Sequence, residues 1–185
     1  GFDVDRVLTV KTTLAEGAYA GDDRVRSFGA ELIRRLGSEP QVSRAGFANY
    51  LPMSRTGAAN RFEIEGRAET RIEDQKFSWV SVVGGQYFEA MGIPLLSGRL
   101  PGREDTETSE PVFVIDELLA RRYWPDGNAL GAHISWHLEN NERLTGRVIV
   151  IVGSVRFLGL AADAPELRAA AGRAVRRALL RAVLP

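Results

Sequence analysis

The stretch YFEAMGIPLLSGR, residues 87–99, decides the fold of this chain. Its two aromatic residues and its methionine are spaced for the inner face of a short helix, and the glycine that follows favours the end of a helix. The proline then suits the start of an edge strand, which the last glycine turns. No acid, base or nucleophile in the stretch is placed to act on a substrate. The residues expected to anchor this part of the core are Tyr87, Phe88, Met91, Gly92 and Pro94.

The composition is that of an ordinary globular protein. Of 185 residues, 44% are hydrophobic and 26% are charged, and a chain of this length buries roughly 70% of its unfolded surface. Lys plus Arg (24) equals Asp plus Glu (24), so no net charge favours nucleic acid, an anionic membrane or an acidic substrate. The absence of cysteine excludes disulfides, thiolate metal sites and cysteine nucleophiles.

The sequence as given predicts no segment that crosses a membrane. The longest uncharged run, Phe77–Phe88, falls short of the ~18 apolar residues that span a bilayer. The chain begins without an initiator Met and without the pattern of a signal peptide. We therefore expect it to be a piece of a longer protein.

The opening fifty residues predict a strand, a helix and a second strand. Val4–Thr12 alternates between apolar and polar residues, as in a half-buried strand. An amphipathic helix follows, capped by Asp22 and Asp23 and ended by Gly37. Val42–Asn49 predicts the second strand. The apolar stripe of the helix consists of Val25, Phe28, Leu32, Ile33 and Leu36.

The middle of the chain predicts short strands separated by glycine, proline and polar turns. The predicted strands are Arg61–Glu65, Phe77–Val83, Val112–Ile115 and His133–Leu138. One helix, Asp116–Trp124, is capped by its first residue and ended by Pro125, and we expect Tyr123 and Trp124 to anchor it in the core. Arg147–Val155 is a continuous β-branched run, typical of a strand buried on both faces.

After Pro165, the sequence ELRAAAGRAVRRALLRAVL predicts an amphipathic basic helix. Most of its arginines at positions 173, 176, 177 and 181 lie on one face. The stripe on the other face consists of Leu167, Ala171, Val175, Ala178, Leu179 and Ala182. We expect this stripe to pack on a sheet, with a lipid surface as the weaker alternative.

Catalytic motifs are absent from the sequence. It contains no phosphate-binding loop and no nucleophile elbow. In HISWHLE, the side chains of His133, His137 and Glu139 lie on one face of a strand and could hold zinc. Alternate residues of a strand are ~7 Å apart, however, so the two histidines are too far apart to share one ion unaided. We favour a solvent-facing surface, and a metal-dependent enzyme is the weaker alternative.

Three acidic pairs could be offered as a general acid and base: Glu104–Asp105, Glu63 with Glu65, and Asp116–Glu117. We interpret them as solvated turn and strand residues and as a helix cap. The sequence therefore predicts no catalytic, cofactor-binding or metal-binding residue.

Five segments in succession carry a family resemblance. They are FEIEGR (62–67), SVVGGQYFEAMGIPLLSGR (81–99), the acidic pair 104–105, VFVIDELLARRYWPDGNALGAHI (112–134) and VIVIVGSVRFLGL (148–160). In this order they resemble the MacB-like periplasmic core domain, the extracytoplasmic domain of MacB/FtsX-type ABC transporter permeases. The resemblance covers about Gly1 to Leu160.

The resemblance implies an α+β fold in which a porter-like βαβ layer carries an inserted, β-rich, sabre-like subdomain. Residues 1–49 and 147–185 would form the porter-like part, shortened after residue 160, and residues 50–146 the insertion. Relatives have Ser-Pro where this chain has Gly84-Gly85-Gln86, and they have further strands where it has only AADAP after Leu160. Two interpretations of this difference stay open: the sheet is smaller than in relatives, or this is a defective or divergent copy whose sheet edge is unpaired and liable to associate.

The resemblance also implies a function without catalysis or cofactors. The domain would lie outside the inner membrane, in the periplasm, as part of a permease homodimer driven by a separate cytoplasmic ATPase. It would transmit ATPase-driven motion or handle substrate, and an adaptor or periplasmic partner is compatible with this role. A free-standing soluble binding module with the same fold is the alternative.

Overall fold

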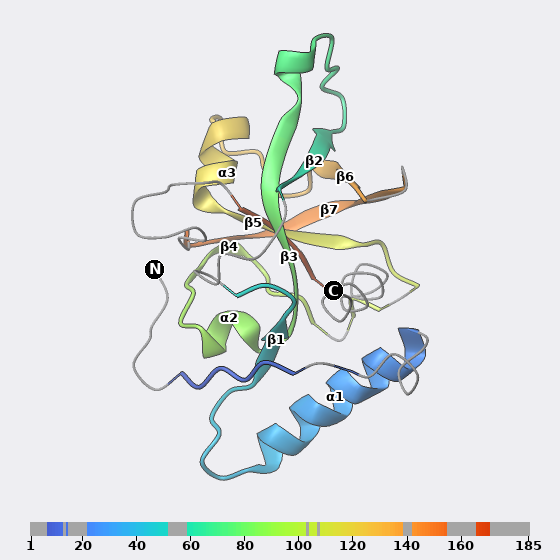
Figure 1. Cartoon of the computed structure of the whole chain (residues 1–185). Coiled ribbons are helices and arrows are strands. Elements are labelled where there is room, and N and C mark those ends of the chain that lie inside the picture. Colours follow the sequence, from blue (N-terminus) through green and yellow to red (C-terminus); the bar gives the residue numbers. More distant parts are fainter. Residues whose placement is uncertain are drawn as a thin grey trace.

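The computed structural model describes residues 7–12, 14, 22–51, 59–102, 104–106, 108–138, 142–154 and 166–170. The described helices and strands are α1 (Asp22–Ser38), β1 (Gly46–Ala48), β2 (Ala59–Ile64), the 3-10 helix η1 (Ile72–Asp74), β3 (Lys76–Gly85), α2 (Tyr87–Ala90), β4 (Leu95–Gly98), β5 (Val112–Asp116), α3 (Glu117–Tyr123), β6 (His133–His137), β7 (Arg143–Val152) and β8 (Glu166–Ala170). A large sheet with few helices agrees with the predicted α+β class (Figure 1).

The strands form one eight-stranded sheet whose pairings run in a closed ring. The order β3, β2, β6, β7, β5 and β8 returns to β3, while β1 pairs with β3 and β4 pairs with β7. The pairs β5–β7 and β3–β8 are parallel, and the others are antiparallel. β3 reaches three neighbours because it is long: residues 76–79 pair with β2, 79–83 with β8 and 83–85 with β1.

The main hydrophobic core is built from the inward-facing residues of this ring. Strand alternation buries Ile134 and Trp136 of β6 and leaves the two histidines of that strand on the outer face. α3 covers this core. Leu119 of the helix and Trp124, directly after it, are both buried in the core. Among the largest side chains with full burial are Phe62, Phe113, Ile115, Leu119 and Ile134.

A second core joins α2 to the sheet. Tyr87, Phe88 and Met91 are buried there among valines of β3, β5 and β7. A Cβ atom at Gly46 would lie 2.5 Å from the Tyr87 Cα, so α2 lies directly against β1. Gly92 ends the helix with a φ of 62°, a conformation that favours glycine.

Most predicted elements of the middle region are confirmed. The four predicted strands are β2, β3, β5 and β6, with small shifts at their ends. α3 begins after Asp116 and ends at Tyr123, as the cap and Pro125 predict. The return strand is β7, which starts at Arg143 rather than at Arg147.

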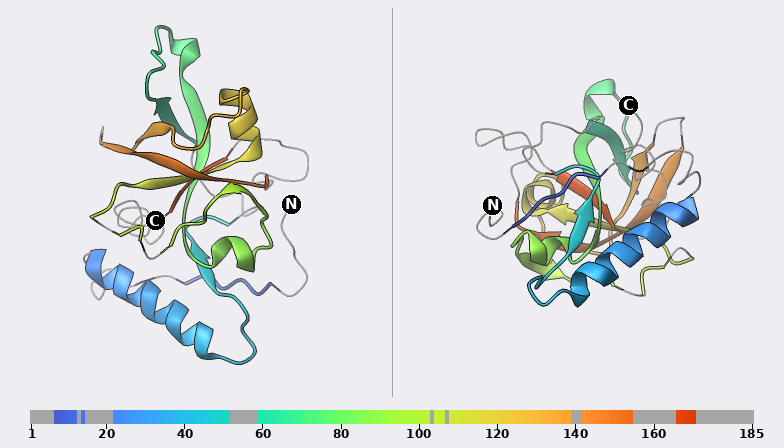
Figure 2. Two further views of the ribbon diagram at one scale, coloured as in Figure 1. Left: turned by 180° about the vertical axis from the view of Figure 1, so that it is seen from behind. Right: turned by 60° about the horizontal axis from the view of Figure 1, so that its bottom comes forward.

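The predicted first helix is α1, which continues through Gly37 to Ser38. Only Val25 of its apolar stripe is fully buried, because α1 covers just the end of the sheet at β1 (Figure 2). β1 is shorter than the predicted strand Val42–Asn49. The side chains of the predicted caps, residues 22 and 23, lie outside the described part of the chain.

The predicted first strand, Val4–Thr12, is wrong in its described part. Residues 7–12 form no strand, and Leu8 and Val10 expose 88% and 78% of their surface. A strand is stable only when a neighbour completes its ladder, and no described strand pairs with this segment. Alternation alone was therefore a misleading signal.

The predicted helix after Pro165 is wrong at its start. Glu166–Ala170 forms β8, which pairs with β3 and with β5. Two neighbouring ladders outweigh the helix propensity of alanine, leucine and arginine. β8 also supplies a strand in the region after Leu160, where the sequence predicted none. The rest of that helix, residues 171–185, lies outside the described residues, and the division into two subdomains stays a prediction.

None of the helices in the described ranges has the length and apolar character needed to cross a bilayer.

Candidate functional surface

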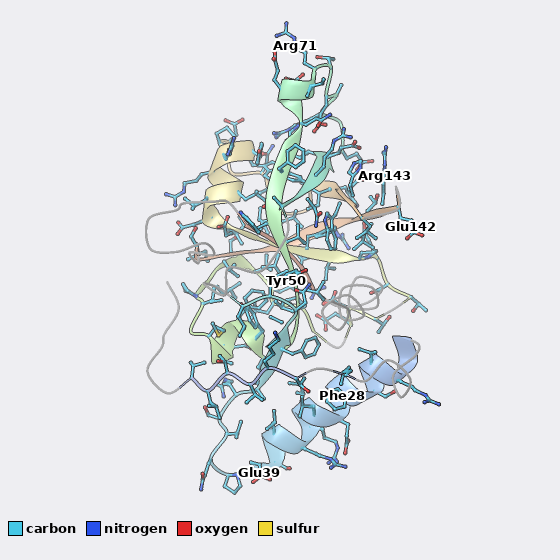
Figure 3. All side chains as sticks on the ribbon, in the orientation of Figure 1. Phe28, Glu39, Tyr50, Arg71, Glu142 and Arg143 are labelled. Carbon is cyan, nitrogen blue, oxygen red and sulfur yellow. The ribbon has the colours of Figure 1, made fainter. Side chains whose placement is uncertain are left out.

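The connection between β2 and β3 stands away from the rest of the molecule (Figure 1). We call residues 65–75 the arm; η1 lies at its outer end, where Figure 3 labels Arg71. The side chains of Arg71 and Glu73 are 73% and 71% exposed, and Ile72 is 85% exposed. The outer end of the arm therefore adds nothing to the core.

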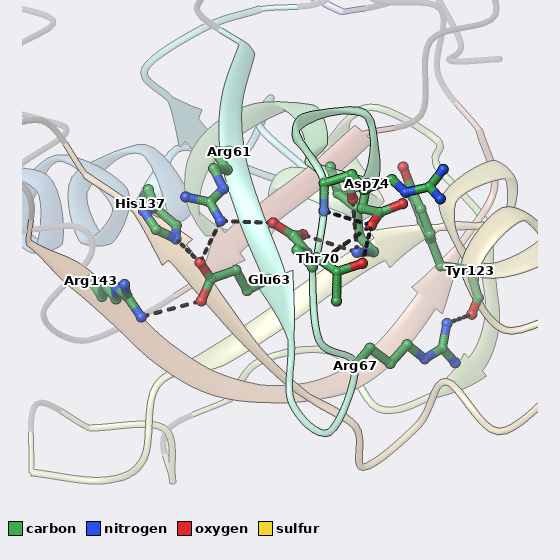
Figure 4. A network of polar contacts seen from close by, with 11 residues as sticks. Arg61, Glu63, Arg67, Thr70, Asp74, Tyr123, His137 and Arg143 are labelled. Carbon is green, nitrogen blue, oxygen red and sulfur yellow. Dashed lines mark hydrogen bonds and ion pairs between the residues drawn. The ribbon is translucent and has the colours of Figure 1, made fainter.

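An ion-pair cluster holds the base of the arm (Figure 4). Glu69 lies between two cations, with Oε2 2.7 Å from Arg61 Nη2 and Oε1 2.9 Å from Lys76 Nζ. Only 6% of the Glu69 side chain is exposed. Burial is the largest single influence on Glu69 and raises its pKa, but the hydrogen bonds and the positive charges of Arg61 and Lys76 together lower the pKa overall. The carboxylate is therefore charged and paired at neutral pH.

A second carboxylate holds the outer end of the arm. Asp74 Oδ2 accepts hydrogen bonds from the Arg71 amide at 2.9 Å, and from the Thr70 amide and hydroxyl at 3.1 Å each. The Arg71 amide and the Thr70 side chain lower the pKa of Asp74. The backbone around η1 is thus fixed by one side chain.

Arg67 ties the arm to α3. Its guanidinium donates a hydrogen bond to the Tyr123 carbonyl oxygen, and its Cζ lies 5.5 Å from the centroid of the Trp124 ring. The last carbonyl groups of a helix have no partner within the helix, so this arginine satisfies one of them. The arm is therefore anchored both at its base and to a neighbouring helix.

The residues that hold the arm in place were missed from the sequence. Arg61, Arg67, Glu69 and Lys76 form no local motif, and their pairing depends on how the connection folds back on itself. The only hint in the sequence was the large number of charged residues between the two strands. Ordinary solvent-exposed turns are equally rich in charged residues, so this hint was not specific.

The two histidines of β6 lie beside glutamates of neighbouring segments. His133 and His137 lie on the same outer face of β6, as predicted, and Glu139 lies outside the described residues. His133 Nε2 is 2.6 Å from Glu110 Oε1, and His137 Nε2 is 3.0 Å from Glu63 Oε1. Within the described ranges, no group of three or more potential metal ligands converges. His133 Nδ1 is also 3.4 Å from Glu65 Oε2, so each histidine of the strand lies beside at least one glutamate.

The predicted solvated turn at Glu104–Asp105 is wrong for Asp105. Its Oδ1 and Oδ2 accept hydrogen bonds from Arg99 at 2.7 Å each, and Oδ2 also accepts one from the Gly102 amide at 2.8 Å. Its side chain is 5% exposed, whereas that of Glu104 is 59% exposed. The hydrogen bond from Arg99 lowers the pKa of Asp105. Nothing local in the sequence distinguishes the two acids.

The predicted anchors differ in burial. The buried ones are Tyr87, Phe88, Met91 and Trp124. Tyr123 is half-buried and its ring meets that of Phe62 edge-on at 5.4 Å, while Gly92, Pro94 and Pro125 are exposed. Their role as anchors stays a prediction, which stability measurements can test.

No family model and no curated protein matches this chain. Three solved structures are similar to it. The extracellular domain of the noncanonic ABC-type transporter YknZ from Gram-positive bacteria has 12% identity and a TM-score of 0.50, covering 77% of this chain and 62% of that one. The periplasmic region of MacB from Actinobacillus actinomycetemcomitans has 18% identity and a TM-score of 0.46, covering 75% and 62%. A domain of a permease protein from Porphyromonas gingivalis has 13% identity and a TM-score of 0.42, covering 60% and 45%.

The chain thus spans less than two thirds of the length of each of these structures. At such low identity, the likeness to the YknZ domain shows a common fold. The predicted resemblance is confirmed as structural similarity to the extracellular domain of a noncanonic ABC-type transporter.

Proposed function

We propose that this chain is the extracytoplasmic domain of an ABC transporter permease and that it works without catalysis. The observation that carries the proposal is the fold it shares with the extracellular domain of the transporter YknZ. The succession of sequence segments from residue 62 to residue 160 supports the same assignment. The domain then lies outside the inner membrane, with membrane spans in flanking sequence.

In this proposal, the parent permease forms a homodimer and a separate cytoplasmic ATPase drives it. The domain transmits the motion or handles substrate and partners outside the membrane. A rigid body suits such a role, and two features support rigidity: the closed ring of strand pairings and the ion pairs that hold the arm. Residues 1–49 with 147–185 form the porter-like part and residues 50–146 the sabre-like insertion.

The first test is the sequence of the parent gene on both sides of this segment. Hydropathy over windows of ~19 residues is expected to show one apolar span before Gly1 and three after Pro185. If neither side contains a span, the chain is a free-standing binding module and the transporter assignment is withdrawn.

A second test places the domain relative to the membrane. Protease added to intact spheroplasts is expected to cleave the parent protein within this domain, while a cytoplasmic marker stays whole. The parent protein is also expected to stay with the membranes after alkaline extraction. Release at alkaline pH, or protection until the cells are lysed, would contradict the proposal.

A further inference from the structure

α3 is a short helix whose two ends contact segments from different parts of the chain. At its C-terminal end, the Arg67 guanidinium of the arm donates to the Tyr123 carbonyl and lies over the Trp124 ring. Both contacts come from one side chain, and Figure 4 shows Arg67 reaching from the arm to Tyr123. The arm is therefore attached to the end of α3, where unpaired carbonyl groups attract a cation.

At its N-terminal end, α3 is attached to the segment that leaves β7. The Leu119 amide donates to Asp116 Oδ1 at 2.7 Å, and the Ser154 hydroxyl donates to Asp116 Oδ2 at 3.3 Å. The Ser154 amide also points to Glu117 Oε1 at 3.5 Å. One carboxylate thus caps the helix and holds residue 154 at the same time.

The helix between these two attachments is fixed in the core. Leu119 and Ala120 are buried, and Trp124, directly after the helix, is 4% exposed. A helix of seven residues is only about 10 Å long, so it has no room to bend between its ends. A displacement at one end therefore moves the other end.

We propose that α3 is a brace that couples the arm to the exit of β7, residues 153–154. Loosening the contact at either end raises the mobility of the segment held at the opposite end. The coupling is a property of this chain alone, so its test does not depend on the proposed transporter function.

Amide hydrogen exchange of the whole chain can measure this coupling. At the β7 exit, the Gly153 amide donates to the Pro94 carbonyl at 2.9 Å and serves as the reporter. On the arm, the reporters are the amides of Asp74 and Gln75, which donate to carbonyl groups at 3.1 and 3.2 Å. Each reporter is hydrogen-bonded, so its exchange rate reports local opening.

The decisive variant is Arg67→Ala, with Arg71→Ala as its matched control. Arg71 lies on the same arm, and its side chain pairs with exposed Glu73 at 2.9 Å. Arg67→Ala is expected to speed exchange at Gly153 about tenfold while amides of α1 keep their rates. Arg71→Ala is expected to change the exchange rate of the Gly153 amide by less than about twofold. If Arg67→Ala leaves Gly153 unchanged, or if both variants change it equally, the brace is refuted.

The reverse experiment guards against a general loss of stability. Ser154→Ala is expected to speed exchange at Asp74 and Gln75, and Arg67→Lys is expected to restore part of the protection lost in Arg67→Ala. Arg67→Ala and Ser154→Ala are each expected to raise the equilibrium constant for unfolding by some factor. When both substitutions are combined, the constant should rise by less than the product of these two factors. A full product would show independent sites and overturn the proposal.

Discussion

Replacing Phe88 by alanine tests the second core most directly. Phe88 is 3% exposed and packs with its neighbours around α2. α2 has only four residues, so it cannot be stable in isolation and depends on this packing. Truncating a buried phenylalanine costs about 3–5 kcal/mol, and we expect about 4 kcal/mol here.

Two features of the site place the expected value above the low end of that range. The rings of Tyr87 and Phe88 meet edge-on with centroids 5.4 Å apart, a contact worth about 1 kcal/mol beyond area burial. The backbone of α2 also lies directly against β1 at Gly46, so the chain cannot move inward to fill the space that the lost ring leaves. An unfilled cavity raises the free-energy cost of the substitution.

Urea unfolding of the 185-residue chain, followed by circular dichroism, measures the effect. The free energy of unfolding falls by about 2 kcal/mol per molar urea, so a loss of about 4 kcal/mol in that free energy lowers the urea midpoint by about 2 M. Leu96→Ala on neighbouring β4 is the control, because Leu96 is 51% exposed and should change stability by less than about 0.5 kcal/mol. A midpoint shift below about 0.5 M for Phe88→Ala, or an equal shift for Leu96→Ala, would refute the role of this residue as an anchor.

Three further experiments have definite expected outcomes. The pKa of Asp105 is lowered in the folded state, so the stability from its pair with Arg99 is present at neutral pH and is lost as pH falls through that pKa. Asp105→Asn should thus cost about 2 kcal/mol at pH 7 and much less in acid, and an equal loss at both pH values would contradict the pairing. Gly46→Ala should destabilise by about 1–3 kcal/mol in urea unfolding, because its Cβ would lie 2.5 Å from Tyr87 Cα; an unchanged midpoint would contradict this close approach. Calorimetry with Zn²⁺ should show no binding, and binding heat that disappears in His137→Ala would restore the metal hypothesis.

Elements defined by local chemistry could be predicted from the sequence. α3 is an example, since its cap, its two aromatic residues and its terminating proline lie within ten consecutive positions, 116–125. The short helix at residue 87 is another, because the glycine at 92 has the positive φ that the sequence pattern implies. In both cases the signals needed for the prediction lie within about three helical turns.

Elements defined by partners far away in the sequence could not be predicted in the same way. Residues 7–12 have the alternation of a strand but no described neighbour, whereas residues 166–170 have a helical pattern but two neighbouring strands. A β-strand depends on pairing between distant segments, so a strand-like local pattern is neither sufficient, as residues 7–12 show, nor required, as residues 166–170 show. The same reasoning applies to Asp105, which is buried because Arg99 folds back onto it.

The arm combines this non-local chemistry with the proposed role. A nearly buried carboxylate lowers stability unless it is paired, yet the chain keeps Glu69 at 6% exposure between Arg61 and Lys76. Three charged side chains therefore fix a segment whose outer end contributes nothing to the core. Such an arrangement has little value for stability alone, but in the proposed role it would keep the projecting arm at a fixed position while the domain moves. It agrees with a domain that contacts other molecules through rigid geometry, as the proposed permease would require.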